Sequence, residues 1–224
     1  MNIKKIDLPN PGVIEAKLNQ EQIDALWLPV HKYAPRESEW IGNTLRKVPT
    51  NLKQWNMKDD NSSFQSDVLM PMVEEYFSNY EIPFSLKTTK YHQFVLSRFW
   101  TRASTAGDYQ SLHDHQGVFT FVVWLTIPFD GESEKNNQAG FRPSAGEFGL
   151  VYNNTCGNIS KKNWTLSPDM EGTVLLFPSD INHIVYPHYS TEDYRISVAG
   201  DIVLDSNNVG GEINPAHVCH AANE

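Results

Sequence analysis

The feature that most constrains the fold is the texture of the chain from about residue 90 to residue 204. Short runs of β-branched and aromatic residues alternate there with Gly, Pro, Asn and Asp, which favour turns. This pattern is typical of an all-β sandwich or barrel, whose strands are short and closely connected. It predicts a mainly β core with flanking helices and with strands at residues 91–99, 118–127, 147–152, 172–177, 183–187 and 194–204.

The first 89 residues have a different character and are expected to wrap around this core as a helical and irregular segment. Residues 20–33 suit a short helix. Residues 66–80 are the stronger helix prediction, because their apolar side chains recur at three-to-four spacing and so line one face. Within them, Ser66 suits the N-cap, and Pro71 fits the first turn, where its missing N–H does no harm.

A length of 224 residues fits one well-buried domain, and we expect a single domain spanning residues 1–224 with the β core at residues 90–204. The tail at residues 205–224 is rich in Asn and Gly and is expected to be mobile. No internal repeat divides the chain.

Residues 130–146 are polar and contain glycine, so they predict a long loop between two strands. Loops of this length often cover or bind ligands. Phe141 and Arg142 are therefore candidates for contact with a substrate, together with the N-terminal segment.

The charge of the chain argues against nucleic acid as a partner. The formal net charge is −9 at pH 7 and the pI is about 5.3, whereas proteins that bind DNA or RNA normally cluster Lys and Arg. No long apolar run occurs, and the N-terminal residues lack the apolar stretch of a secretory signal. We expect a soluble, cytoplasmic protein without a membrane partner. The sequence leaves open the substrate, a small molecule or a peptide, and the oligomeric state.

The segment Leu112-His113-Asp114-His115 stands just before the apolar run at residues 118–125. In an extended chain, positions i and i+2 project to the same side, so His113 and His115 can present two imidazoles to one ion while Asp114 points away. The 8 histidines of this chain give about 0.3 such pairs by chance. Alone, the pair fits equally well two strand-end histidines that bond to water and backbone.

A second feature is a glycine turn at Gly172, followed by the apolar strand at residues 173–177, a Pro178-Ser179 corner and then His183. In a jelly-roll barrel, such a corner brings a histidine back toward the start of a neighbouring strand. His183 would then complete a ligand set on one side of an octahedral ion and leave the other side open. Alone, His183 fits a half-buried strand histidine better.

The third feature is Arg195-Ile196-Ser197 in the last candidate strand. Arg195 and Ser197 share one face of that strand, so a guanidinium group and a hydroxyl lie side by side. The pair suits a carboxylate, because Arg can donate two parallel, charge-assisted hydrogen bonds. The alternative is an exposed Arg195 that pairs with Asp193 or Asp201.

In order and spacing, these three features resemble the 2-oxoglutarate and iron(II)-dependent oxygenases. The resemblance covers about residues 91–204 and points to a branch with His-x-His before an apolar strand, a Leu-Phe-Pro-Ser corner, a histidine in the next strand, and Arg-x-Ser. It implies a double-stranded β-helix, the jelly-roll core shared with cupins, and it implies Fe(II), 2-oxoglutarate as cosubstrate and O2. The implied reaction couples oxidative decarboxylation of 2-oxoglutarate to hydroxylation of a substrate.

Position by position, the resemblance makes His113 and His183 metal ligands. It makes Arg195, with Ser197, the clamp for the distal carboxylate of 2-oxoglutarate. Tyr109 could add a hydroxyl to the cosubstrate pocket, although a packed aromatic at the entrance of a strand is the more common role for such a residue.

Position 115 departs from the superfamily, because most members have Asp or Glu where this chain has His115. A neutral imidazole would leave the iron more positively charged than a carboxylate would. Asp114 could replace His115 as the third ligand only if the backbone twisted. The third ligand is therefore open between these two residues.

Two other functions fit the same residues. One is a cupin-like dioxygenase or isomerase that uses three histidines without 2-oxoglutarate, which the ligand set favours and the Arg195-Ser197 pair disfavours. The other is a non-catalytic β-barrel binding module, which would not depend on a metal at His113 and His183. Metal content and 2-oxoglutarate turnover separate the three.

Overall fold

The computed structural model describes residues 1–224 except 7–11, 50, 81–91, 138–143, 155 and 206–224. Its strands are β1 (Asn2–Ile6), β2 (Val13–Lys17), β3 (Glu39–Ile41), β4 (Thr44–Lys47), β5 (Gln54–Asn56), β6 (Phe94–Ser104), β7 (Gln110–His113), β8 (Phe119–Thr126), β9 (Glu147–Asn153), β10 (Ile159–Thr165), β11 (Thr173–Pro178), β12 (Asn182–Val185) and β13 (Arg195–Leu204). They form a seven-stranded sheet in the order β1-β2-β11-β8-β13-β6-β5, a four-stranded sheet in the order β10-β9-β12-β7, and the hairpin β3-β4.

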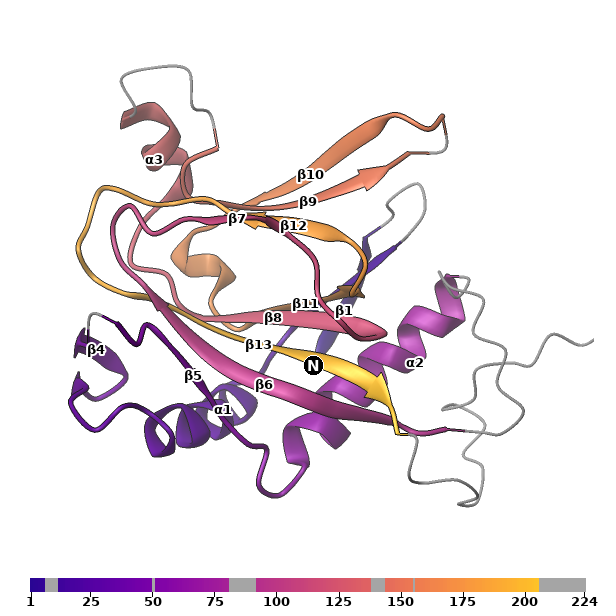
Figure 1. The fold of residues 1–224 in the computed structure, drawn as a ribbon, viewed down its shortest axis with the longest axis horizontal. Coiled ribbons are helices and arrows are strands. Elements are labelled where there is room, and N and C mark those ends of the chain that lie inside the picture. The colour runs from indigo at the N-terminus through magenta and orange to yellow at the C-terminus, as the bar shows by residue number, and fades with distance from the viewer. Residues whose placement is uncertain (7–11, 50, 81–91, 138–143, 155, 206–224) are drawn as a thin grey trace, which may run out of the picture.

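The strands from β6 to β13 form the double-stranded β-helix that the sequence predicts. Along the chain, β6, β8, β11 and β13 fall in the large sheet, and β7, β9, β10 and β12 fall in the small sheet, so the chain crosses repeatedly between them. Strand β13 lies between β8 and β6 and pairs with both in antiparallel fashion. Figure 1 shows the two sheets facing each other, with the small sheet at the top. The predicted mainly β core is confirmed.

The predicted helices at residues 20–33 and 66–80 are present. The helical segments are α1 (Gln20–Lys32), the π-helical turn η1 (Gln65–Leu69), α2 (Met70–Asn79), α3 (Gly131–Asn137) and the 3-10 turn η2 (Pro168–Met170). Helix α1 begins with a capping box, in which the Asn19 side chain accepts from the Gln22 N–H at 2.8 Å and the Gln22 side chain accepts from the Asn19 N–H at 3.0 Å. Helices α1 and α2 pack on the outer face of the large sheet (Figure 1).

The start of the second helical segment differs from the prediction. Ser66 does not cap it, because helical turns begin at Ser63 and Ser66 lies inside η1. Pro71 lies in the first turn of α2, as expected. Since Pro71 has no N–H, the i→i−4 hydrogen bond to the preceding turn is lost, which is consistent with the wider π-helical turn just before it.

Both faces of β8 and β11 in the large sheet are buried, and this explains why these two strands are almost continuously apolar. In β8, Phe121 and Val123 join a hydrophobic cluster with side chains of α1 and α2. Trp124 points the other way, into a second cluster between the sheets that includes Phe148 and Phe177. Side chains of this second cluster line the candidate site described below.

The N-terminal region also supplies strands that the sequence pattern did not predict. Strand β2 pairs with β11, and β5 pairs with β6, so residues 1–89 extend the large sheet at both edges. Strand β2 has five residues and β5 has three. Strands this short show too few alternations for the period to stand out in the sequence.

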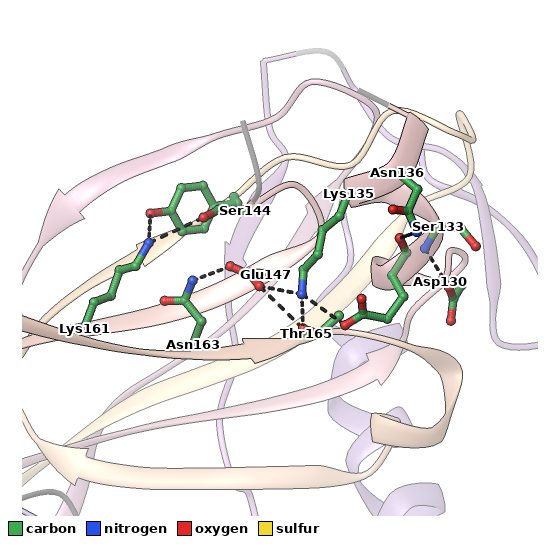
Figure 2. Close-up of polar contacts among 11 residues, drawn as sticks. Asp130, Ser133, Lys135, Asn136, Ser144, Glu147, Lys161, Asn163 and Thr165 are labelled. Carbon is green, nitrogen blue, oxygen red and sulfur yellow. Dashed lines mark hydrogen bonds and ion pairs between the residues drawn. The ribbon is translucent and has the colours of Figure 1, made fainter. Parts of the chain in front are cut away.

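The stretch predicted as a long loop at residues 130–146 contains α3, which is tied to the small sheet. Lys135 lies 2.8 Å from the carboxylate of Glu147 and donates to the Thr165 hydroxyl at 2.5 Å (Figure 2). Glu147 is nearly fully buried and also accepts from the Asn163 side chain. A buried carboxylate with a cationic partner and hydrogen bonds holds the position of the helix.

Some predictions concern residues outside the described ranges. These include substrate contact by Phe141 and Arg142 and the mobility of the tail after Asp205. In the part of the chain that the structure describes, no helix is long and apolar enough to cross a membrane.

Candidate functional site

Three histidine rings meet where β7, β12 and the turn before β8 come together. One ring nitrogen from each of His113, His115 and His183 lies within 4.8 Å of the others. The ring centroids are 4.1 Å apart for His113 and His183, 4.9 Å for His115 and His183, and 5.3 Å for His113 and His115. Asp114 is exposed and lies outside this group. The structure therefore brings His115, and not Asp114, to the two other histidines.

Strand pairing and the Leu-Phe-Pro-Ser corner place the three rings. His113 is the last residue of β7 and is the direct cross-strand partner of His183 in β12. His115 follows the end of β7, and its backbone N–H donates to the carbonyl oxygen of Ser179 at 3.1 Å. Because Ser179 belongs to the corner after β11, that corner holds the turn that presents His115.

Hydrogen bonds determine which ring nitrogen carries the proton in two of the histidines. Nδ1 of His113 donates to the carbonyl oxygen of Ser111 at 2.6 Å, and Nδ1 of His115 lies 2.8 Å from Oδ1 of Asp201. Carbonyl and carboxylate oxygens only accept, so Nδ1 carries the hydrogen and Nε2 keeps its lone pair. Metal-binding histidines usually adopt this arrangement, with the other ring nitrogen donating to a carbonyl or carboxylate.

His183 is the most buried member of the cluster, at 6% exposure. Burial, together with the neighbouring His113 and His115 rings, lowers the pKa of His183 from 6.5 to about 3. The ring is therefore neutral at physiological pH and can serve as a ligand without first losing a proton. Its buried Nδ1 has no hydrogen-bond partner among the described residues.

Arg195, at the start of β13, is a buried cation at 2% exposure. Nη1 donates to the carbonyl oxygen of Tyr186 at 3.2 Å, and the described residues offer the guanidinium no carboxylate within ion-pair distance. Burial, and then the positive charge of Arg102, lower the pKa of Arg195 to about 10. A buried cation is costly without an anionic partner, so this environment suits a site that receives an anion.

The alternative pairings of Arg195 are wrong. Asp193 lies 3.8 Å from Arg46 on the surface, and Asp201 contacts His115 instead. Strand alternation points Asp201 into the barrel six residues beyond Arg195, too far along β13 for contact.

Arg195 and the three histidines line one pocket, together with Ser197. Arg195, Ser197 and Ala199 occupy alternate positions of β13 and therefore face the same side of the sheet. No Asp or Glu among the described residues lines this pocket, and most of its remaining lining is apolar. The lining residues are Trp100, Arg102, Ser104, Gln110, His113, His115, Thr120, Phe121, Val122, Trp124, Phe148, Phe177, His183, Val185, Arg195, Ser197 and Ala199.

Among the lining residues that sequence reasoning did not assign to the site, Arg102 and Trp100 on β6 are the most relevant to its chemistry. Arg102 is the cross-strand neighbour of Ser197, and its Nε is buried without a hydrogen-bond partner among the described residues. The Trp100 ring stacks on the His115 ring, with centroids 5.3 Å apart and planes inclined by 23°. The signal that could have found them is the alternation of Arg98, Trp100 and Arg102, which puts basic and aromatic side chains on one face.

The structure does not bring Tyr109 to the pocket. Its side chain is 51% exposed, whereas the next residue, Gln110, lines the pocket. Between β12 and β7 the register shifts, so that Val185 faces Gln110 while His183 faces His113. This irregularity changes the alternation within β7 and leaves Tyr109 on the outside, which corrects its proposed cosubstrate role.

A second, wider pocket adjoins the first and shares His113, His115, Trp100 and Gln110 with it. It extends along β5 and the beginning of β6, where Arg98 is one of the lining residues. The histidines thus stand between an inner pocket that contains Arg195 and an outer pocket that is open to solvent.

Comparison with known protein families finds a match that covers the β core. Residues 98–201 match the family model described as "Putative 2OG-Fe(II) oxygenase". This region is similar to the 2-oxoglutarate and iron(II)-dependent oxygenases. The matched region runs from β6 to β13 and contains the three histidines, Arg195 and Ser197. No curated protein matches the chain.

Solved structures of two other proteins share the fold of this chain. One is an oxidoreductase of the 2OG-Fe(II) oxygenase family from Burkholderia pseudomallei, with a TM-score of 0.51 and 11% identity over 85% of this chain and 84% of that chain. The other is the non-heme α-ketoglutarate-dependent carbocyclase SnoK from nogalamycin biosynthesis, with a TM-score of 0.51 and 8% identity over 86% of this chain and 79% of that chain. At these identities the likeness concerns the fold.

Iron(II), the metal of this superfamily, fits the donors that the structure brings together. Imidazole nitrogen is a suitable ligand for iron. The hydrogen bonds of His113 and His115 leave their Nε2 lone pairs free, and His183 is held neutral by burial. The same donors also suit zinc, copper or nickel, so the histidines alone do not select iron.

Proposed function

We propose that this oxygenase couples the oxidative decarboxylation of 2-oxoglutarate to the hydroxylation of a small molecule or peptide. In the overall reaction, a substrate C–H bond, 2-oxoglutarate and O2 give the hydroxylated substrate, succinate and CO2. The best support is that the buried guanidinium of Arg195 lies in the same pocket as the three histidines. Among the described residues, no carboxylate forms an ion pair with it. A cytoplasmic location, expected from the sequence, is part of this proposal.

His113, His115 and His183 would hold the metal. When bound, iron(II) supplies the centre at which 2-oxoglutarate and O2 react. The contribution of the protein is to orient the imidazoles and to keep the buried His183 ring neutral. His113 and His115 are oriented by the acceptors at their Nδ1 atoms, and His183 is kept neutral by burial.

Arg195 would bind the distal carboxylate of 2-oxoglutarate through charge-assisted hydrogen bonds. Ser197, two residues further along β13, offers a hydroxyl on the same side. Arg102 lies opposite Ser197 and gives the pocket a second positive charge. Two cations, with no carboxylate among the described lining residues, favour a dianion such as 2-oxoglutarate over a neutral ligand.

The apolar side chains of the inner pocket would keep water away from the reacting atoms. Trp124, Phe148 and Phe177 are buried and line it between the two sheets. A dry site strengthens the pairing of Arg195 with an anion. The substrate would enter through the outer pocket, because that pocket reaches the same histidines from solvent.

The test is turnover of 2-oxoglutarate by the purified full-length chain with iron(II), ascorbate and O2. We expect succinate to form, and to depend on all three additions and on His113. If iron-dependent O2 consumption occurs without consumption of 2-oxoglutarate, the three-histidine dioxygenase without 2-oxoglutarate is the better assignment. If the chain binds no iron, the non-catalytic binding module is the better assignment.

A further inference from the structure

Asp201 is a fully buried carboxylate in contact with one of the three histidines. Its side chain is 0% exposed, and Oδ1 lies 2.8 Å from Nδ1 of His115. Asp201 itself does not line the inner pocket or belong to the histidine group. Asp201 therefore contacts the side of the His115 ring that faces away from the proposed metal position.

Building on the proposed metal site, we propose that Asp201 is a positioning residue that supplies, through His115, the negative charge that a ligand set of three neutral imidazoles lacks. The resemblance described above leads to the expectation of a carboxylate ligand where this chain has His115. In this chain the carboxylate would act one step further out, because an N–H that donates to a carboxylate makes the other ring nitrogen a stronger donor to a metal.

The other contacts of Asp201 are a neutral hydroxyl and a largely exposed arginine. Thr120 donates from its hydroxyl to the same Oδ1 at 3.1 Å. Arg98 approaches Oδ2 only to 3.8 Å, from a side chain that is 66% exposed, and Oδ2 has no hydrogen-bond partner among the described residues. A buried carboxylate in these surroundings gains most when a cation is added nearby. A metal ion on the far side of the His115 ring would be such a cation.

The geometry around Asp201 is closely constrained. Thr120 is its cross-strand partner in β8, and the Thr120 hydroxyl also bonds to the Ser179 hydroxyl at 3.0 Å. The backbone carbonyl oxygen of Ser179 accepts the backbone N–H of His115 at 3.1 Å. A Cβ on Gly200 would collide with the Phe121 ring and with the backbone of β6, so a glycine is needed next to Asp201. The carboxylate, the hydroxyls and the ring therefore form one fixed network.

The experiment measures Co(II) affinity by visible absorption, because Co(II) reports binding without turnover. Four full-length proteins are compared: wild type, Asp201→Asn, His115→Asp, and the double variant. The Asn side chain can still accept from Nδ1 of His115 but carries no charge. We expect Asp201→Asn to weaken Co(II) binding about 10- to 100-fold. In the His115→Asp background, the same change should leave Co(II) affinity unchanged or improve it, because the charge then sits on the ligand itself.

Equal weakening by Asp201→Asn in both backgrounds would overturn the proposal, since Asp201 would then act through the fold and not through His115. The proposal would also be overturned if Asp201→Asn bound Co(II) with the same affinity as the wild type. His113→Ala separates the two levels of the account: if it leaves Co(II) affinity unaltered, the metal site itself is wrong, whereas a loss in His113→Ala without a loss in Asp201→Asn removes only the role of Asp201.

A measurement on the wild type keeps the proposal testable if Asp201→Asn does not fold. In the Zn(II)-loaded protein, the nitrogen chemical shifts of the histidines distinguish a metal-bound ring nitrogen from a protonated one. We expect His115 to bind through Nε2 and to keep its hydrogen on Nδ1. Metal binding through Nδ1 of His115 would displace Asp201 and contradict the proposal.

Discussion

His113 and His183 are direct cross-strand partners, and their ring centroids lie 4.1 Å apart. One residue comes from the last position of β7 and the other from β12, at the edge of the small sheet. A metal held by both rings would link these two strands. Because a slip of one residue would turn either ring to the opposite face, metal binding and the register of this strand pair should depend on each other.

The first prediction follows from that relationship. His113→Ala and His183→Ala should each abolish the thermal stabilisation of the protein by iron(II) under argon, because the ion loses a ligand from one of the two strands. In the wild type, iron(II) at one hundred times its Kd should raise the unfolding free energy by about 2.7 kcal/mol. His31→Ala, in α1, is the control and should keep that stabilisation. A full metal-induced rise in Tm in both ligand variants would contradict the assignment.

The second prediction concerns the pH dependence of the metal-free protein. The pKa of His183 is lowered in the fold from 6.5 to about 3, so below pH 6.5 the unfolded chain binds a proton that the folded chain does not. Stability should therefore be fully present above pH 6.5 and should fall between pH 6.5 and 3, by at most about 1.4 kcal/mol per pH unit from this residue. Urea unfolding at pH 7.5 and 5.0 measures the change. His183→Gln should show a smaller loss on acidification, and an unchanged loss would argue against the buried, neutral ring.

Most of the core strands could be predicted from the sequence, but β7 and β10 could not. In β7, the four residues Gln110–His113 are partly exposed and show no apolar alternation. In β10, the segment ISKKNWT has a single buried side chain, Trp164, and no apolar alternation. Such strands form because neighbouring strands offer hydrogen-bonding edges, which is a property of the assembled sheet.

Some residues of the candidate site could likewise be predicted from the sequence, and others could not. His113, His115, His183 and Arg195 could be found because the order and spacing of their short motifs resemble a known superfamily, although no single motif is specific. Asp201 could not be assigned to His115, because the two are separated by 86 positions and meet only through the register of β8 and β13. Arg102 and Trp100 were missed for a similar reason, since β6 and β13 must pair before these side chains face the pocket.

The third prediction tests Arg102. Arg102→Gln should weaken 2-oxoglutarate binding about 3- to 10-fold, because it removes one of two positive charges from the pocket while Arg195 remains; this range corresponds to a charge interaction of roughly 1 kcal/mol. Arg46→Gln removes a positive charge at the surface and is the matched control. Titration of 2-oxoglutarate into the iron(II) protein under argon gives both affinities. An equal change in the two variants would mean that only net charge matters.

The fourth prediction concerns packing next to Asp201. A Cβ at position 200 would lie 2.6 Å from the Phe121 ring and would also meet the carbonyl oxygen of Arg98. Gly200→Ala should therefore lower the unfolding free energy by about 1–3 kcal/mol, as expected for overpacking in a closely packed core. Urea denaturation measures this loss. A variant as stable as the wild type would show that β13 and β6 can separate at this point without cost.

The central claim is that one pocket holds both a metal and the distal carboxylate of 2-oxoglutarate, and Arg195→Met tests it most directly. The measurement is the visible absorption of the iron(II) and 2-oxoglutarate complex, titrated under argon in the wild type and in the variant. We expect the variant to keep iron(II) but to bind 2-oxoglutarate at least about 30-fold more weakly, because the carboxylate loses a buried, hydrogen-bonded charge partner. The metal-free variant should be no less stable than the wild type, since the substitution removes an unpaired buried cation. Unchanged 2-oxoglutarate affinity in Arg195→Met would contradict the account.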